Sequence, residues 1–322
     1  MATHTITGTR TKPWHITTAN DTWVLSEGAT FKITNHVPAI DDSPGAGHSD
    51  IRILGTLKAP DAYAIDLQTD DNSVLFGANA VVHTSTAAYL SGAGNTIVNH
   101  GDIVTTYVAL YGGGEGTSFT NSGTVSGYGG FESAQKSAHI VNQAGGLIGG
   151  GDAIYLLGTA GTATIDNMGK ISGTSTAIVD ASTGGATHVT NTGTIHGSVD
   201  LGDSNDHFDS HLGTYSSVAG GDGNDTYILG KGQHVTEDAG MGFDTVKSYA
   251  SATLDAYVDF LTLMGKGNFS GHGNELDNLV YGNKGSNHLF GMGGEDTIGG
   301  KAGNDFLTGG AGNDLFVFGK GD

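Results

Sequence analysis

The C-terminal part of the chain repeats a pattern of nine residues. Five consecutive copies run from residue 273 to 317, and a sixth stands alone at 220–228. Glycine recurs in the first half of each copy, Asp or Asn stands at the sixth position, and an apolar residue follows two places later. The copies read GNELDNLVY, GNKGSNHLF, GMGGEDTIG, GKAGNDFLT, GGAGNDLFV and GGDGNDTYI. One copy is too short to bury an apolar face alone, so the pattern predicts copies stacked into an elongated repeat structure.

A second, longer period covers the front of the chain. The motif Asn-x-Gly-x-Ile/Val recurs in steps of 21 to 25 residues, at Asn99, Asn121, Asn167 and Asn191, with a looser copy at Asn142. Short apolar runs follow most copies and are typical of strands between polar turns. The step length fits one rung of a parallel β-helix, in which stacked Asn side chains hydrogen-bond from rung to rung. We expect roughly six to eight rungs between about residues 25 and 200.

Composition favours a turn-rich, all-β chain. The 322 residues include 56 Gly, 4 Pro and no Cys. Glycine far above the usual ~7% argues against long helices. The missing cysteines exclude disulfides and thiol catalysis, and they are compatible with an extracellular protein that is stabilised by another device.

Charge and hydropathy narrow the possible partners. The net charge of −20 argues against nucleic acid and anionic membranes, both of which need a basic face, and it calls for cations that neutralise part of it. The chain has neither an N-terminal apolar segment typical of a Sec signal nor a run of about 18 apolar residues, so we expect no membrane span.

The nonapeptides are suited to hold a hard cation. Glycine at positions one, two and four lets the backbone take positive φ and turn its carbonyl oxygens inward, and the sixth-position carboxylate adds charge. Calcium takes six to eight oxygen ligands, so this set suits Ca2+ better than zinc. The pattern resembles the RTX, or hemolysin-type, calcium-binding repeat G-G-x-G-x-D-x-U-x, where U is apolar. The resemblance covers residues 220–228 and 273–317 and implies a parallel β-roll in which two nonapeptides complete one coil.

We therefore predict an all-β fold in two parts. A right-handed parallel β-helix (β-solenoid) would occupy residues 1–200, followed at 201–322 by a calcium-binding parallel β-roll with a spacer at 229–272. Residues 14–33 would cap the first edge through Trp14 and Trp23, and residues 37–50 would form a surface loop. In the spacer we expect strands that continue the stack, with three core residues: Tyr257, Phe260 and Leu263. In the roll, four residues would point inward: Ile228, Ile298, Leu307 and Phe316.

The 18-residue coil predicts which acids meet. Asp296 and Asp314 should share one edge and bracket a calcium ion, whereas Asp305 should lie on the opposite edge. Asn278 and Asn287 lack charge, so weaker or purely structural sites are expected there.

Further candidates lie outside these acids. Asp206 and Asp225 are 19 residues apart and suggest a separate small site with Asp203 or Asp222. The remaining candidate metal-binding residues contribute backbone oxygens: Gly220, Gly291, Gly293, Gly300, Ala302, Gly309 and Ala311.

The resemblance also implies how the protein is exported and where it folds. Proteins with such repeats are exported unfolded through type I secretion machinery and fold outside the cell, where calcium is abundant. We expect several Ca2+ ions and a secreted, extracellular or cell-surface protein. It would act as an adhesin or a self-assembling surface-layer or filament component, through self-association or binding to cell-surface or matrix polysaccharide. The chain stops at GKGD, which looks like the start of another turn.

Two alternatives stay open. The first is a polysaccharide lyase or epimerase with an RTX tail, which would need a base beside acids. Arg10 and Arg52 lie outside the regular rungs, and we assign no catalytic residue. The second is a transition-metal site, because His207 and His211 stand among aspartates. Fourteen histidines are scattered along the chain, which favours chance clustering.

Overall fold

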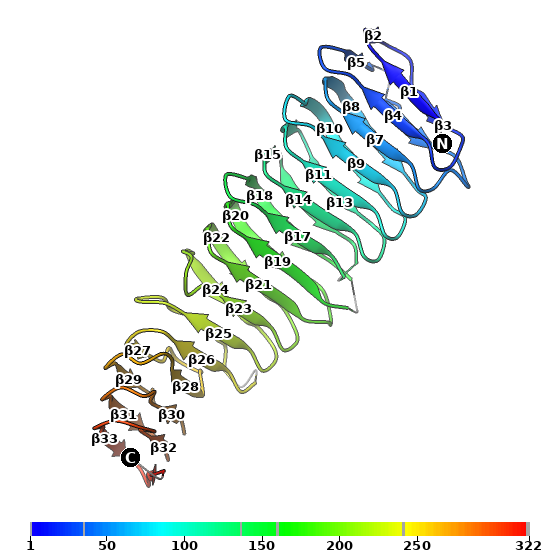
Figure 1. Ribbon diagram of the computed structural model, residues 1–322. Helices are drawn as coiled ribbons and strands as arrows, with labels where there is room; N and C mark the ends of the chain where they lie inside the picture. Colours follow the sequence, from blue (N-terminus) through cyan, green and yellow to red (C-terminus); the bar gives the residue numbers. More distant parts are fainter. Residues whose placement is uncertain (1, 35, 136, 159–160, 240–241, 320–322) are drawn as a thin grey trace. The chain divides into compact units, whose positions relative to one another are not determined.

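The computed structural model describes residues 2–34, 36–135, 137–158, 161–239 and 242–319. Every named element in these ranges is a β-strand. The chain divides into two compact units, Met1–Gly185 with Gly193–Val199 and Ala186–Thr192 with Asp200–Asp322. Parallel strands stacked rung upon rung build each unit, which confirms the predicted all-β parallel solenoid (Figure 1). Among the described residues there is no helix with the length and apolar character needed to cross a membrane.

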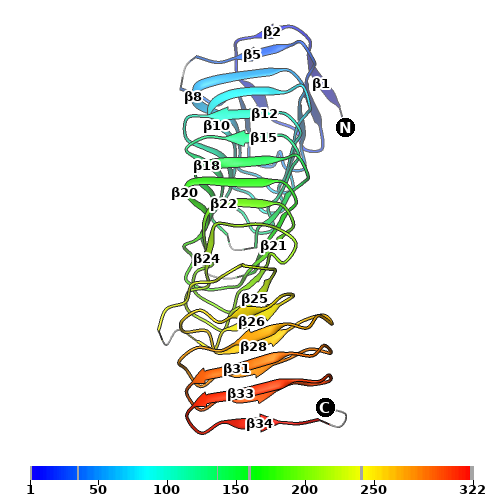
Figure 2. The same ribbon diagram turned by 90° about the vertical axis from the view of Figure 1, so that its left-hand side faces the viewer.

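Two sheets form the walls of the first unit, and Figure 2 shows the second from its own side. The first sheet contains, in order, β1 (Thr3–Ile6), β4 (Thr22–Leu25), β7 (Asp50–Ile53), β9 (Ser73–Phe76), β11 (Thr96–Asn99), β14 (Ser118–Asn121), β17 (His139–Asn142) and β19 (Ala163–Asn167). The second contains β2 (Thr9–Arg10), β5 (Thr30–Lys32), β8 (Thr56–Leu67), β10 (Val81–Leu90), β12 (Asp102–Thr105), β15 (Thr124–Ser126), β18 (Leu147–Leu156), β20 (Lys170–Asp180) and β22 (Thr194–Asp200). Four strands pair beside that path: β3 (Trp14–Ile16), β6 (Ile40–Asp42), β13 (Val108–Gly112) and β16 (Gly129–Ser133).

The rung count and the Asn stack agree with the sequence. Among the described residues, seven strands of the first sheet lie within the range where rungs were predicted, from β7 to β21 (Thr187–Asn191). Asn99, Asn121, Asn142 and Asn167 end four successive strands and lie in register. Each Nδ2 donates to the next Oδ1, at 2.9, 2.9 and 2.8 Å, and all four side chains are buried. The predicted ladder is confirmed, and it satisfies the polar atoms that line the inside of this wall.

The predicted cap is wrong in position. Residues 14–33 form β3, β4 and β5, and β4 is paired on both sides, with β1 and with β7. The edge strand is β1, because its Thr-His-Thr-Ile alternation lets it pair as one more strand. Trp14 and Trp23 are buried as expected, with ring centroids 4.8 Å apart, and the His4 ring stacks on Trp23 at 3.9 Å.

The predicted surface loop at residues 37–50 is also wrong in part. Ile40–Asp42 forms β6, which pairs with β3 and β8. Ala39 and Ile40 are fully buried, so this segment contributes a strand to the wall.

The second unit has the same parallel build. One sheet runs β21 (Thr187–Asn191), β23 (His207–Asp209), β25 (Thr226–Leu229), β26 (Thr245–Ser248), β28 (Phe260–Leu263), β30 (Leu279–Tyr281), β32 (Thr297–Gly299) and β34 (Leu315–Val317). Another runs β27 (Ala252–Thr253), β29 (Ser270–His272), β31 (His288–Gly293) and β33 (Phe306–Ala311), and β24 is Ser217–Ala219. The spacer therefore continues the stack through β26 to β29, as predicted.

The inward positions of this unit differ from several predictions. Tyr227 is fully buried and Ile228 is not, because the eighth position of that nonapeptide is Tyr227. Ile298 is buried as predicted. Leu307 pairs with buried Leu289 and is half-buried, and Phe316 pairs with Ile298 but stays 37% exposed, since no described coil follows it.

The spacer core is corrected in the same way. Tyr257 is 45% exposed and has φ 68°, so it belongs to a turn. Phe260 is half-buried, and its neighbour Leu261 faces the core together with Leu263.

Candidate metal centre

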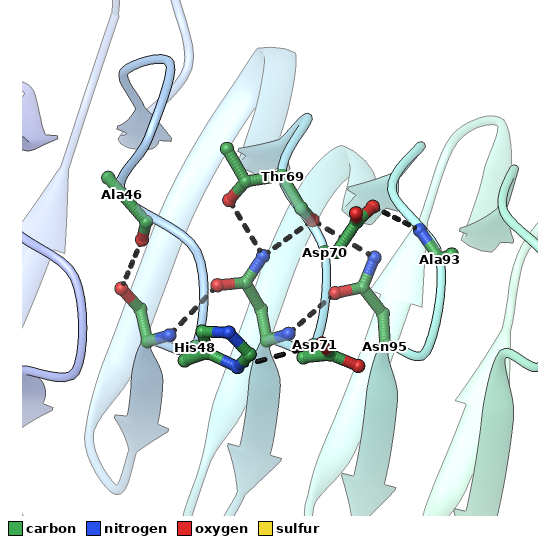
Figure 3. Close-up of polar contacts among 9 residues, drawn as sticks. Ala46, His48, Thr69, Asp70, Asp71, Ala93 and Asn95 are labelled. Carbon is green, nitrogen blue, oxygen red and sulfur yellow. Dashed lines mark hydrogen bonds and ion pairs between the residues drawn. The ribbon is translucent and has the colours of Figure 1, made fainter.

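A recurring bend precedes the strands of the first sheet, and in the first unit it holds an amide at two places and the carboxylate of Asp21 before β4. Ser49, Asn72 and Asn95 stand immediately before β7, β9 and β11. The Ser49 N–H donates to Asn72 Oδ1 (3.0 Å), and the Asn72 N–H donates to Asn95 Oδ1 (2.7 Å) (Figure 3). The second amide atom donates as well, from Asn72 Nδ2 to the Thr69 carbonyl (2.8 Å) and from Asn95 Nδ2 to the Gly92 carbonyl (2.7 Å). One amide thus satisfies an N–H of the neighbouring rung and a carbonyl of its own bend.

In the second unit the same bend holds carboxylates. The Asp206 N–H donates to Asp225 Oδ1 (2.7 Å), the Asp225 N–H to Asp244 Oδ1 (2.9 Å), and the Asp244 N–H to Asp259 Oδ2 (2.8 Å). A carboxylate repeats the accepting role of Asn, but it has no N–H to offer the carbonyl oxygens of the bend. Replacing Asn by Asp at this position therefore creates an oxygen-only environment with a negative charge.

Two sixth-position carboxylates of the nonapeptides are deeply buried with one oxygen unpaired. Asp225 and Asp296 are each 1% exposed, and the Oδ2 of each has no hydrogen-bond partner. Burial raises the pKa of Asp225 to about 7 and shifts the pKa of Asp296 in the same direction. An unpaired buried charge is costly, so these oxygens are suited to a cation.

The first-position glycine makes room for the carboxylate. A Cβ atom on this glycine would lie within 2.2 Å of Oδ2 of the Asp in the same copy, at Gly220, Gly291, Gly300 and Gly309. None of these four glycines has positive φ, so the expectation of positive φ at the first position is wrong. Glycine is required there by the close approach of the carboxylate. The space beside the glycine, where a Cβ atom would otherwise lie, fits a cation-binding carboxylate.

Positive φ occurs elsewhere in the nonapeptide. The fourth position carries it with φ of 100–136°, at Gly223, Gly294, Gly303 and Gly312. The second position carries it in Met292 (87°) and Lys301 (68°), which are not glycine. The turn thus needs left-handed backbone at positions two and four.

Two turns close with amides alone. Asn278 Oδ1 accepts from the Asn274 N–H (2.7 Å), and Asn278 Nδ2 donates to the carbonyls of Val258 (3.1 Å) and Asp259 (3.2 Å). Asn287 makes equivalent bonds in its own turn. In both turns the side-chain N–H of Asn donates to the backbone carbonyl oxygens, so these oxygens are already hydrogen-bonded. This agrees with a purely structural role for the two positions.

The structure places the three sixth-position acids where the coil length predicts. The Asp296 N–H donates to Asp314 Oδ1 (3.1 Å), and β32 pairs with β34. Asp305 lies before β33 in the other sheet, where its Oδ1 accepts from the Asn287 N–H (2.8 Å). Calcium binding at these acids stays a prediction, and so does a ligand role for Gly293, Ala302 and Ala311, of which the two alanines are exposed.

The acids that lie close to Asp225 differ from those predicted to form a small site with it. Asp203 and Asp222 are exposed, and the Asp222 backbone oxygen accepts from the Ser204 N–H (2.6 Å). Within the described ranges, one group of three metal-binding side chains has its ligand atoms within 4.8 Å of one another: Asp225, Glu237 and Asp244. His207 and His211 are not part of it, and His211 Nδ1 instead lies 2.5 Å from Asp209 Oδ1.

Sequence reasoning missed Glu237 and Asp244. Asp244 ends the run Gly-Met-Gly-Phe-Asp, a degenerate nonapeptide start that a looser pattern could have found. Glu237 carries no sequence signal, because it belongs to no repeat.

The comparisons with known proteins agree with the geometry of the turns. The family model described as the RTX calcium-binding nonapeptide repeat (4 copies) matches residues 216–233, 272–307 and 296–322. The C-terminal part of the chain therefore carries RTX repeats. RTX repeats bind calcium and are typical of secreted proteins, and here they follow a β-helix.

One curated relative shares a short segment with this chain. The endo-1,3-1,4-beta-glycanase ExsH of Rhizobium meliloti (strain 1021) is 40% identical over 65 residues, which is 20% of this chain and 14% of that enzyme. The chain thus spans about a seventh of the relative's length. No solved structure matches the chain.

Proposed function

We propose that this protein is a calcium-stabilised structural solenoid of a bacterial surface or extracellular matrix. The single observation that carries the proposal is that bends of one kind hold amides at Asn72 and Asn95 but buried carboxylates at Asp225 and Asp296. Asn72 and Asn95 close their bends with N–H donors. Asp225 and Asp296 instead keep a buried oxygen without a partner, so these two bends call for a cation where the two amide bends do not.

Calcium of the external medium supplies those cations. Extracellular calcium modules bind at roughly 10⁻⁴–10⁻³ M. At calcium tenfold above such a constant, each occupied site adds about 1.4 kcal/mol of stability. Several sites together decide whether the second unit folds, since a domain has only ~5–15 kcal/mol in total. In the low calcium of a cytosol the buried carboxylates oppose folding, which keeps the chain open for type I secretion machinery.

The outer faces suit a structural or adhesive role. A stack of parallel strands offers repeating lateral faces for a second copy of the chain or for a surface or matrix polysaccharide. The acidic chain, with a net charge of −20, disfavours anionic partners unless calcium bridges them. We place the protein outside the cell, as an adhesin or as a self-assembling surface-layer or filament component.

A calcium titration tests the proposal. Far-ultraviolet circular dichroism of the full chain is expected to gain β signal as calcium rises through the millimolar range and to lose it again with EGTA. The double variant Asp296→Ala/Asp314→Ala should need more calcium. Electron microscopy of the same samples should show assemblies in calcium only. A circular dichroism spectrum that does not change with calcium across this range contradicts the proposal.

A second candidate function is action on a polysaccharide, and a cavity on the first unit favours it. Tyr107 and Tyr128 are 59% and 69% exposed, and their rings lie 6.2 Å apart and nearly parallel. They line a cavity of about 220 Å³ together with Glu132 and Asp152. Burial raises the pKa of Glu132, as a general acid requires. Two carboxylates beside aromatic rings are the elements of a glycoside-cleaving site.

The enzyme hypothesis has its own test. The purified chain is incubated with a mixed-linkage β-glycan and with uronate polysaccharides, and new reducing ends and unsaturated products are measured. Activity that Glu132→Gln abolishes and exposed Glu115→Gln retains would establish the cavity as the site. Equal traces of activity in all three proteins would point to a contaminant and reject this candidate.

A further inference from the structure

Glu237 faces the interior of the second unit, where the repeat pattern places apolar residues. Thr236 forms a parallel bridge with Ala219, and its N–H donates to the Val218 carbonyl (2.9 Å). Side chains alternate in extended backbone, so Val235 and Glu237 point to the same side. They are 5% and 6% exposed. The side chain of Glu237 therefore points into the core of the second unit.

The Glu237 carboxylate meets two aspartates and one hydroxyl. The Tyr227 hydroxyl donates to Glu237 Oε1, and Tyr227 is itself fully buried. Ligand oxygens of Asp225, Glu237 and Asp244 lie within 4.8 Å of one another. Asp225 Oδ2 and Glu237 Oε2 have no hydrogen-bond partner, although both side chains are more than nine-tenths buried.

The backbone leaves no room for another side chain at this cluster. A Cβ atom on Gly220 would lie 2.1 Å from both Asp225 Oδ2 and the Tyr227 hydroxyl. Within the described part of the chain, no ion pair links a lysine, arginine or histidine to any of the three carboxylates. Three acids are thus buried together without a positive partner.

We propose that Asp225, Glu237 and Asp244 together hold one calcium ion inside the second unit. The ligands come from three separate places along the chain: the nonapeptide turn, the returning segment and the next bend. The set is oxygen only, which suits a hard cation and disfavours zinc or copper. The ion neutralises carboxylates that would otherwise repel one another, and Tyr227 orients Glu237 through its hydroxyl.

This inference rests on the proposed calcium function only for the choice of ion. Its new element is Glu237, a carboxylate outside every nonapeptide, which ties residues 230–239 to the turn at Asp225. The site therefore couples binding of one ion to docking of a segment that the repeats alone do not hold.

Ion counting on the full chain tests the proposal. Wild type, Glu237→Gln and Asp238→Asn are equilibrated with millimolar calcium, and bound calcium per chain is measured after rapid buffer exchange. Asp238 is the matched control, because it is the exposed neighbour and its change removes the same charge. The expected result is one ion fewer per chain in Glu237→Gln and no change in Asp238→Asn. Equal counts in all three proteins overturn the inference, while calcium binding by wild type leaves the proposed function standing.

A spectroscopic measurement covers the case in which Glu237→Gln fails to fold. Terbium replaces calcium in the wild-type chain, and emission is excited through tyrosine, which transfers energy only over short distances. Tyr227→Phe, which keeps the ring and the three carboxylates, should lose most of the sensitised emission per terbium ion bound, with the bound ions counted by direct excitation. Unchanged sensitised emission in Tyr227→Phe would show that no ion lies beside this cluster. A wild-type chain that binds neither ion would instead reject the proposed function.

Discussion

Asn278 and Asp296 stand at equivalent bends one coil apart, and the Asn278 N–H donates to Asp296 Oδ1 at 2.9 Å. Asn278 turns its second side-chain atom, an N–H donor, toward the carbonyls of Val258 and Asp259. Asp296 instead faces the neighbouring rung with its accepting Oδ1, and its Oδ2, beside the first-position glycine where Asn278 has Oδ1, has no partner. This pair contains, within one fold, a bend closed by hydrogen bonds and a bend that calls for a cation.

Asp296→Asn should give this bend an amide of the kind found at Asn72 and Asn95, whose Oδ1 also accepts from the neighbouring rung. The amide is nearly isosteric and supplies the missing donor, so the calcium-free melting temperature should rise. The calcium-dependent part of stability should fall by about 1.4 kcal/mol at calcium tenfold above the dissociation constant. Calorimetry with and without calcium measures both, with exposed Asp203→Asn as the control. A calcium-induced melting shift equal to that of wild type would contradict this assignment.

Gly291→Ala should disturb the turn without touching a ligand side chain. The new Cβ would lie 2.1 Å from Asp296 Oδ2 and 2.6 Å from the Gly309 carbonyl, so the carboxylate must move. We expect a loss of about 1–3 kcal/mol in the free energy of unfolding in calcium. Denaturant unfolding measures it. Gly8→Ala is the control, because a Cβ there meets nothing within 4 Å. Similar losses in both variants would speak against the close-approach argument.

Asn121→Ala should weaken the first unit in a manner independent of calcium. The change removes the Asn121 donor from Asn142 Oδ1 and takes from Asn99 Nδ2 its shortest hydrogen bond inside the wall. Each buried polar atom left unsatisfied costs about 1–3 kcal/mol. Hydrogen exchange of β11, β14 and β17 should accelerate equally with and without calcium. Asn79→Ala, an exposed Asn, serves as the control, and protection that calcium restores in Asn121→Ala would refute the ladder as the cause.

Acid should release the first edge strand through Asp21. The Ala2 N–H, the Thr18 hydroxyl and His4 bind this carboxylate and lower its pKa to about 2. A lowered folded-state pKa contributes stability above the unfolded value near 4, and that stability is lost as pH falls toward 2. Hydrogen exchange of β1 should therefore rise between about pH 4 and pH 2. In Asp21→Asn the exchange should be fast already at neutral pH, and a wild-type profile flat over this range would exclude the mechanism.

Much of the fold could be read from periodic features. The spacing of Asn99, Asn121, Asn142 and Asn167 predicted both the rungs and the ladder, because residues one rung apart lie in register. The 18-residue coil likewise predicted that Asp296 meets Asp314 and that Asp305 lies in another sheet. Predictions that lacked a period were less successful. Tyr257, the cap and the loop at residues 37–50 lay outside any period, and the structure corrects each of them. Ile228 was placed from the nonapeptide, but the buried eighth position of that copy is Tyr227.

The sequence by itself determined that this chain stacks parallel β-coils and gathers carboxylates behind glycine, because a repeat imposes the same contacts on every copy. Only the tertiary structure decided that Glu237 enters the core beside Asp225 and Asp244, and that first-position glycines serve a close approach of the carboxylate. Both facts arise from contacts between segments that no common period relates. Such contacts depend on where the returning backbone runs in three dimensions.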